Sequence, residues 1–201
     1  GGAGDDRLYA SVSNVLLNAD PNKTSFQIMS DEQSDTFVGG IGSDTIIAGN
    51  SADSIDGGTG ANVIYANGGN DTIRGGISNY VDAGDGDDDV RTGGSAIISG
   101  GAGNDYLEAA DNLNNISGGT GNDWIVGSGV LTGGAGDDLF AVDLVPPTLY
   151  NPYLITDFSA GGSEDSMDNY HLLQDLRARG FDATSIGEWL RLVQDGADTK
   201  L

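Results

Sequence analysis

The sequence predicts an all-β fold: a right-handed parallel β-roll, which is a β-solenoid of nonapeptide repeats, with a small α+β cap at its C-terminal end. Three observations support this prediction. A glycine- and aspartate-rich pattern of nine residues returns along most of the chain, and one large apolar residue recurs at the same spacing. Glycine makes up 34 of the 201 residues, more than twice its usual share of about 7%. A fixed short period of this kind is typical of a solenoid, in which each repeat packs on its neighbours.

The nine-residue unit reads Gly-Gly-x-Gly-x-Asp-x-U-x, where U is a large apolar residue. Residues 1–9, 39–47, 100–108, 118–126 and 133–141 fit it strictly. Residues 83–91 differ only by Ala83 in place of the first glycine, and residues 66–74 fit more loosely. Composition alone would suggest a disordered chain, because glycine and net charge are both high. The strict copies, with near copies between them, favour a folded repeat instead.

The U positions supply a second periodicity. Most successive positions are nine residues apart, and the rhythm continues through the degenerate copies. This continuity predicts that the degenerate copies are also turns of one solenoid. The U residues are Phe37, Ile46, Ile55, Ile64, Ile73, Val81, Val90, Ile98, Leu107, Ile116, Ile125, Leu131 and Phe140.

Each unit divides into a turn and a strand. Glycine adopts positive φ at little steric cost, so the glycine-rich half is expected to form a tight turn. The x-U-x half forms a short strand that points U inward and both flanking side chains toward solvent. Two units make one coil, and coils stack at about 4.8 Å, the distance between hydrogen-bonded strands.

Composition and charge exclude several other classes of protein. The formal net charge is −23, from 31 acidic and 8 basic residues, which does not suit a nucleic-acid partner. The chain has no cysteine, so disulfides, thiolate metal sites and cysteine nucleophiles are excluded. No apolar run reaches the about 18 residues of a membrane span. Residue 1 opens in mid-pattern and no N-terminal signal peptide is visible, so we expect a piece of a longer protein.

The strict copies, for example GGAGNDYLE at residues 100–108, resemble the calcium-binding nonapeptide of the repeats-in-toxin (RTX) family. That family includes the calcium β-rolls of secreted bacterial toxins, proteases, lipases and adhesins. The resemblance implies that Ca²⁺ is the cofactor and that each ion lies between two neighbouring turns on the same side. It also implies that carbonyls of the first four turn positions and the aspartate at position six are the ligands. Calcium suits such a set because it takes six to eight oxygens.

Turns on the same side are two repeats apart, so the turns form two series. We name the turns that begin at residues 30, 48, 66, 83, 100, 118 and 133 the aspartate edge. We name the turns that begin at residues 39, 57, 75, 92, 109 and 127 the mixed edge. On the mixed edge only Asp44 keeps the acid, Asn62 and Asn114 replace it, and three turns are shortened. The sixth position of the aspartate edge is always acidic: Asp35, Asp53, Asp71, Asp88, Asp105, Asp123 and Asp138.

These series predict an asymmetric roll. We expect a ladder of about four to six calcium ions along the aspartate edge and at most one or two near Asp44. The alternative for any single aspartate is a plain turn residue, since aspartate favours turns. By the resemblance, the expected glycine ligands are Gly84, Gly86, Gly101, Gly103, Gly119, Gly121, Gly134 and Gly136.

The two ends depart from the repeat, and three regions are expected: residues 1–29, 30–141 and 142–201. Residues 10–29 lack the repeat and are expected to form strands and a loop that cap the first coil or are inserted between coils. Residues 154–158 (LITDF) resemble the I-x-D-F segment that closes the roll in many family members, which makes Asp157 an expected ligand of a last ion. Residues 168–179 predict a helix with leucines on one face.

The last residues, about 45 in all, resemble the C-terminal target region of type I secreted proteins, most of all large adhesins. The chain stops where that pattern would continue, so the export signal is expected beyond Leu201. We therefore expect a calcium-binding module that folds outside the bacterial cell and supports type I secretion of a large surface adhesin. The alternative is the C-terminal module of a secreted RTX enzyme or toxin. Calcium ions and, transiently, the secretion machinery are the expected partners of a monomeric, extracellular chain.

No catalytic role is predicted. The single histidine, His171, lies in the expected helix without a partnering motif, and neither G-x-S-x-G nor H-E-x-x-H occurs. Paired carboxylates for sugar hydrolysis are disfavoured because a calcium turn accounts for each acid. An ice- or sugar-binding outer face is a further alternative, but Arg74 and Arg91 interrupt it and favour an ordinary solvated surface. The outward residues concerned are Thr36, Thr45, Thr72, Tyr106 and Trp124.

Overall fold

The computed structural model describes residues 6–8, 17–18, 24–27, 34–110, 113–141, 154–157 and 165–167. For residues 6–8, 17–18, 24–27 and 167 it describes the backbone only. All regular elements in these ranges are β-strands. The helix expected at residues 168–179 and the single histidine lie outside the described residues. The all-β solenoid predicted from the repeat is confirmed.

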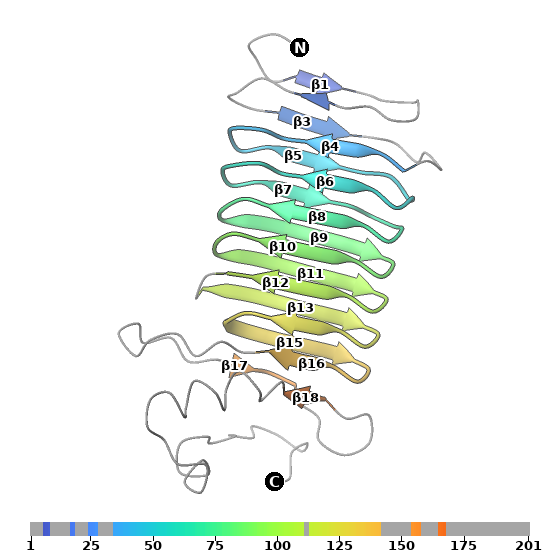
Figure 1. The fold of residues 1–201 in the computed structure, drawn as a ribbon, viewed down its shortest axis with the longest axis vertical. Coiled ribbons are helices and arrows are strands. Elements are labelled where there is room, and N and C mark those ends of the chain that lie inside the picture. Colours follow the sequence, from blue (N-terminus) through green and yellow to red (C-terminus); the bar gives the residue numbers. More distant parts are fainter. Residues whose placement is uncertain are drawn as a thin grey trace, which may run out of the picture.

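The described strands form two parallel sheets of nine strands each, and the chain passes from one sheet to the other at every turn (Figure 1). Successive coils therefore stack along the long axis of the molecule. Sheet A contains β1 (Asp6–Leu8), β3 (Thr24–Gln27), β5 (Thr45–Ile47), β7 (Val63–Tyr65), β9 (Asn79–Asp85), β11 (Ala96–Ala102), β13 (Asn114–Thr120), β15 (Gly129–Ala135) and β17 (Leu154–Ile155). Sheet B contains β2 (Leu17–Asn18), β4 (Thr36–Val38), β6 (Ser54–Asp56), β8 (Thr72–Gly75), β10 (Asp89–Thr92), β12 (Tyr106–Ala109), β14 (Trp124–Val126), β16 (Leu139–Ala141) and β18 (Ser166–Met167).

The core is a double column of the predicted U residues. In sheet A the register aligns Ile46 with Ile64 and then with Val81, and in sheet B it aligns Phe37 with Ile55. All thirteen U side chains are at most 1% exposed. Parallel pairing places identical positions of neighbouring coils opposite each other, so one apolar residue per repeat suffices to build a continuous core.

The glycine positions of the turns are required by both conformation and space. Gly101 has φ of +117°, which L-residues with a side chain rarely adopt. A methyl group there would collide with the carbonyl oxygen of Gly84 in the preceding coil. Gly103 has φ of +134° and approaches the carbonyl oxygen of Gly86 in the same way. The backbones of successive turns are therefore packed directly on one another.

Within residues 10–29, the structure describes residues 17–18 and 24–27, and both segments are strands of the solenoid. β1, β3 and β5 pair in sequence in sheet A, and β2 pairs with β4 in sheet B. The Cα register aligns Leu8 with Phe26 and Leu17 with Phe37. Leu8, Leu17 and Phe26 are nine residues apart, so the U rhythm continues through a region whose turns have lost the Gly-Asp pattern.

The C-terminal segment adds one strand to each sheet. β17 pairs with β15, and β18 pairs with β16. Ile155 is aligned with Leu131 and packs against the core, which extends the apolar column of sheet A by one position. Residues 154–155 thus continue sheet A beyond β15.

Candidate calcium sites

The sixth-position residues of the aspartate edge form one continuous hydrogen-bonded ladder. The backbone N–H of each aspartate donates to Oδ1 of the aspartate in the following coil: Asp35 to Asp53, Asp53 to Asp71, Asp71 to Asp88, Asp88 to Asp105, Asp105 to Asp123 and Asp123 to Asp138. These six bonds measure 2.7–2.9 Å between nitrogen and oxygen. The structure therefore brings all seven predicted aspartates into a single file, and each of their side chains is buried.

The second carboxylate oxygen defines the chemistry of this edge. Oδ2 of Asp71, Asp88, Asp105, Asp123 and Asp138 is buried and has no hydrogen-bond partner. A buried acceptor without a partner is destabilising, and a buried charge without a partner more so. The basic side chains that the structure describes, Arg74 and Arg91, project from the strands of sheet B and not from these turns. A row of such oxygens could therefore hold added cations.

The electrostatics of the ladder support the same conclusion. Burial, the largest cause, raises the pKa of Asp71 to about 8, of Asp123 to about 7, and of Asp88 and Asp105 to about 6. The N–H bond from the preceding coil opposes each rise, and neighbouring carboxylates add to it. The pKa of Asp138 is raised for the same reason. A cation beside these groups would favour the ionised form.

Backbone carbonyls lie close to the same carboxylates. A methyl group added at Gly118 would lie 2.5 Å from the carbonyl oxygen of Gly133 and would also meet Oδ2 of Asp123. The equivalent methyl group at Gly100 would meet Oδ2 of Asp105 and would lie 2.6 Å from the carbonyl oxygen of Gly118. A carboxylate oxygen and a carbonyl oxygen are both acceptors, so only a donor or a cation satisfies both. Hard oxygen ligands of these two kinds suit Ca²⁺.

On the mixed edge, Asn62 and Asn114 satisfy their own side-chain polar atoms. Oδ1 of Asn62 accepts the backbone N–H of Asp44 at 2.9 Å, while its Nδ2 donates to the carbonyl oxygen of Gly57 at 2.9 Å. Asn114 repeats the arrangement, accepting from Ala96 at 3.0 Å and donating to Ala109 at 3.4 Å. The amide N–H replaces the cation that a carboxylate would need at this position.

The shortened turns of the mixed edge keep the side chain two residues before each U position in register with its neighbours. Asn79 stands opposite Ala96, and its Oδ1 accepts the backbone N–H of Asn62 at 3.1 Å. We did not assign Asn79 from sequence because counting forward from the first glycine of an eight-residue copy misplaces it. Counting back two residues from the U position Val81 finds it. Its Nδ2 is buried without a hydrogen-bond partner, so this rung is less well satisfied than Asn62.

The aspartate ladder continues into the C-terminal segment through a residue that the sequence reasoning missed. The backbone N–H of Asp138 donates to Oδ1 of Asp165 at 3.1 Å, which makes Asp165 the eighth rung. Asp165 lies two residues before Met167, and Met167 is aligned with Phe140. The Asp-x-U spacing of the repeat is therefore present here without its glycines.

Asp157 occupies a different place from the ladder. Its Oδ1 accepts the N–H of Gly133 at 2.9 Å and its Oδ2 accepts the N–H of Gly134 at 2.7 Å. The carboxylate thus caps backbone donors of the last aspartate-edge turn. Asp157 and Asp165 together bring two carboxylates from the C-terminal segment to this edge.

An exposed second ladder runs beside the buried one at the fifth turn position. The N–H of Asn104 donates to Oδ1 of Asp87 at 2.7 Å, and the N–H of Asn122 donates to Oδ1 of Asn104 at 2.9 Å. These bonds point toward the preceding coil, whereas the buried bonds point toward the following one. Two opposed hydrogen bonds therefore join each pair of these turns.

Among the described residues, no three or more His, Cys, Asp or Glu side chains form a metal-holding group. This agrees with the ladder, because each coil contributes a single buried aspartate and backbone carbonyls must complete any ligand set. No helix long and apolar enough to span a membrane occurs in the part of the chain that the structure describes.

Comparison with known proteins identifies the repeat. The family model of the RTX calcium-binding nonapeptide repeat matches four copies, at residues 1–20, 30–64, 47–81 and 109–129. These residues therefore match RTX calcium-binding repeats, and the buried aspartate ladder fits Ca²⁺ sites. The strict copy at residues 100–108 lies outside these matches, but the ladder runs through it unchanged. No match was found among curated proteins or among solved structures.

Proposed function

We propose that this chain is a calcium-dependent folding module that supports type I secretion of a large bacterial surface adhesin. The observation that carries the proposal is the file of buried aspartates whose Oδ2 atoms lack partners in Asp71, Asp88, Asp105, Asp123 and Asp138. Without calcium these groups oppose folding. With calcium they become ligands, together with the neighbouring carbonyls, and the same residues then favour the folded roll.

The ligands of the proposal follow the aspartate edge. Asp35, Asp53, Asp71, Asp88, Asp105, Asp123 and Asp138 supply carboxylates, with Asp165 at the C-terminal end. The carbonyls come from the first-position glycines Gly118 and Gly133 and from the glycines of positions two and four: Gly84, Gly86, Gly101, Gly103, Gly119, Gly121, Gly134 and Gly136. Asp44 is the acidic position of the mixed edge. Asp157 positions the last turn because its carboxylate accepts the backbone N–H groups of Gly133 and Gly134.

Linkage explains how such a module would respond to its surroundings. Calcium that binds the folded chain alone stabilises it by RT ln(1 + [Ca²⁺]/Kd), which is about 2.7 kcal/mol per site at a hundredfold excess over Kd. Several sites along one edge make folding steep in calcium concentration. In the bacterial cytosol, where calcium is scarce, the net charge of −23 keeps the chain expanded and competent for export. Outside the cell, calcium drives folding, and the folded roll resists sliding back into the secretion channel.

The alternative is the C-terminal module of a secreted RTX enzyme or toxin. Both versions use the same calcium switch and differ in the segments attached to it. Sequence upstream of residue 1 distinguishes them: many repeated domains of about 100 residues support the adhesin. An upstream domain with H-E-x-x-H or G-x-S-x-G would support the enzyme.

A calcium titration followed by far-UV circular dichroism tests the proposal, with magnesium as the control ion. We expect a sharp transition from coil to β-structure with calcium and none with magnesium, which prefers a smaller octahedral site. A chain already folded in chelator and unchanged by calcium would contradict the proposed switch.

A further inference from the structure

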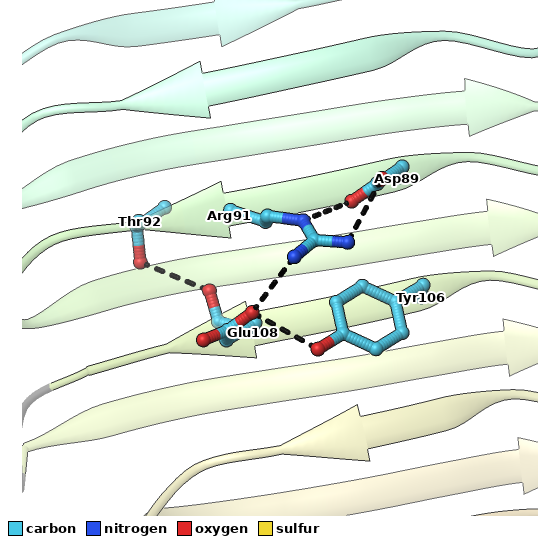
Figure 2. A network of polar contacts seen from close by, with 5 residues as sticks. All are labelled: Asp89, Arg91, Thr92, Tyr106 and Glu108. Atoms are coloured by element: carbon cyan, nitrogen blue, oxygen red, sulfur yellow. Dashed lines mark hydrogen bonds and ion pairs between the residues drawn. The ribbon is translucent and has the colours of Figure 1, made fainter.

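The outer face of sheet B carries a group of side chains that calcium binding does not use. We call Asp89, Arg91, Tyr106, Glu108 and Trp124 the aromatic patch (Figure 2 shows its members except Trp124). They come from the three neighbouring strands β10, β12 and β14. Parallel pairing aligns Asp89 with Tyr106 and Tyr106 with Trp124, so these three residues form one outward column.

Charged contacts hold the patch in one arrangement. Arg91 Nε lies 2.8 Å from Asp89 Oδ1, and Arg91 Nη1 lies 3.5 Å from Glu108 Oε2. The Tyr106 hydroxyl donates to the same Glu108 oxygen at 2.9 Å. The Arg91 guanidinium also lies over the Tyr106 ring, 4.5 Å from its centroid. Exposed side chains are ordinarily mobile, so this network fixes Tyr106 before any ligand arrives.

Trp124 completes the patch and leaves much of its ring accessible. Its ring meets the Tyr106 ring edge to face, with centroids 5.2 Å apart and an interplanar angle of 83°. Trp124 is 46% exposed. A tryptophan contributes a large apolar surface and an indole N–H donor, which makes it effective at binding surfaces with mixed character.

The chemistry of the patch favours a sugar. A pyranose ring offers an apolar C–H face, which stacks on an aromatic ring, and hydroxyls, which bond to carboxylates and guanidinium. Trp124 supplies the ring, while Asp89, Arg91 and Glu108 supply fixed acceptors and donors around it. Their side chains remain 38–49% exposed, so they can reach a ligand.

Charge decides which sugars fit. Arg91 is already paired with Asp89 and Glu108, so the patch itself has no excess positive charge. The chain as a whole has a net charge of −23, which repels acidic polymers. We infer that the aromatic patch on sheet B binds neutral glycans, with Trp124 as the stacking residue.

Affinity measurements on the calcium-loaded chain test this inference. Isothermal titration uses cello-, chito-, malto-, xylo- and manno-oligosaccharides, with oligogalacturonate as the acidic probe. We expect at least one neutral oligosaccharide to bind and Trp124→Ala to weaken it by about tenfold or more. Tyr106→Phe, which removes only the hydroxyl that bonds Glu108, should weaken binding by a smaller factor.

Tyr80→Ala is the matched control. Tyr80 is 37% exposed on the outer face of sheet A, and its ring lies 5.7 Å from that of Tyr65, so it belongs to a comparable aromatic pair. This variant should bind like the unchanged chain. Circular dichroism of each variant in calcium establishes folding separately, so a failure of the calcium switch is distinguished from a failure to bind sugar. The inference is overturned if no neutral probe binds the folded chain, if Trp124→Ala binds equally well, or if oligogalacturonate binds more tightly.

Discussion

The backbone N–H of Asp88 donates to Oδ1 of Asp105 at 2.9 Å, and this bond leaves Oδ2 of Asp105 buried without a partner. On the mixed edge, Asn62 makes the equivalent Oδ1 bond, but its second polar atom is an amide nitrogen that donates to Gly57. The two residues therefore differ in one atom: Asp105 has a carboxylate oxygen that needs a cation, whereas Asn62 has an amide nitrogen that already donates a hydrogen bond. Exchanging these residues exchanges the properties of the two edges.

Asp105→Asn should make its rung independent of calcium. The amide keeps the Oδ1 acceptor, and its nitrogen can donate to a turn carbonyl as Asn62 does. We expect the free energy of unfolding in chelator to rise by about 1–3 kcal/mol, since a buried unpaired acceptor is removed. Fewer calcium ions should bind per chain. Urea unfolding in chelator and equilibrium dialysis with calcium measure the two effects.

Asp87→Asn is the control for that substitution, because it makes the same change of charge one coil away. Asp87 is exposed and belongs to the exposed second ladder, where its Oδ1 accepts the backbone N–H of Asn104. Stability in chelator should change little and calcium stoichiometry not at all. Equal effects of Asp87→Asn and Asp105→Asn would mean that net charge, and not the buried Oδ2, governs calcium dependence.

Asn62→Asp should have the opposite effect on the mixed edge. The substitution removes the bond to Gly57 and places a second buried acceptor beside that carbonyl. In chelator we expect a loss of about 1–3 kcal/mol in the free energy of unfolding, recovered at saturating calcium. Loss of stability that calcium does not recover would show that the mixed edge cannot form a calcium site even with its acid restored.

Gly101→Ala should destabilise the roll in the presence of calcium. Alanine at φ of +117° is strained, and its methyl group would collide with the carbonyl oxygen of Gly84. We expect a loss of at least about 1–3 kcal/mol from backbone strain alone. Gly93→Ala is the matched control, because a methyl group there meets only the carbonyl oxygen of Gly76 at 3.6 Å. Thermal unfolding of both variants in calcium measures the difference. Equal unfolding midpoints for Gly101→Ala and Gly93→Ala would contradict this account.

Calcium-free folding should become less favourable as pH rises. The pKa of Asp71, Asp88, Asp105 and Asp123 in the folded chain lies between about 6 and about 8, above the ordinary value of 3.8. The folded state therefore binds more protons than the unfolded state, and the stability that this gives is lost as pH rises through 6 to 8. In chelator, the urea midpoint should be higher at pH about 5 than at pH about 8. A midpoint that increases with pH over this range would contradict the burial of these carboxylates.

The core and the aspartate edge could be predicted because both depend on residues that recur at fixed distances. Each U residue from Phe37 to Phe140 is buried, and the seven sixth-position aspartates of the aspartate edge join one ladder. The distance from the ladder residue to U is always two, as the strand geometry demands, whereas the turn before it varies in length. Predictions that counted from the first glycine therefore missed Asn79.

The ends were harder to predict because their turns lack the glycines that mark the repeat. Leu17 and Phe26 keep the spacing of nine from Leu8, and Asp165 keeps the spacing of two from Met167. Only pairing in space shows that these spacings belong to the solenoid. The hydrogen bonds that the asparagine amides of the mixed edge donate were not foreseen. The bond from Asn62 to Gly57, for example, depends on side-chain geometry and not on spacing.

The central claim is that calcium binds mainly along the aspartate edge, from Asp35 to Asp138, and not along the asparagine positions of the mixed edge. Anomalous diffraction at a long wavelength, from crystals grown in calcium, locates the ions directly. The account predicts a row of calcium peaks beside the aspartate ladder, with at most one or two peaks near Asp44 on the mixed edge. Equal occupancy of both edges, or no calcium beside Asp105 and Asp123, would contradict it.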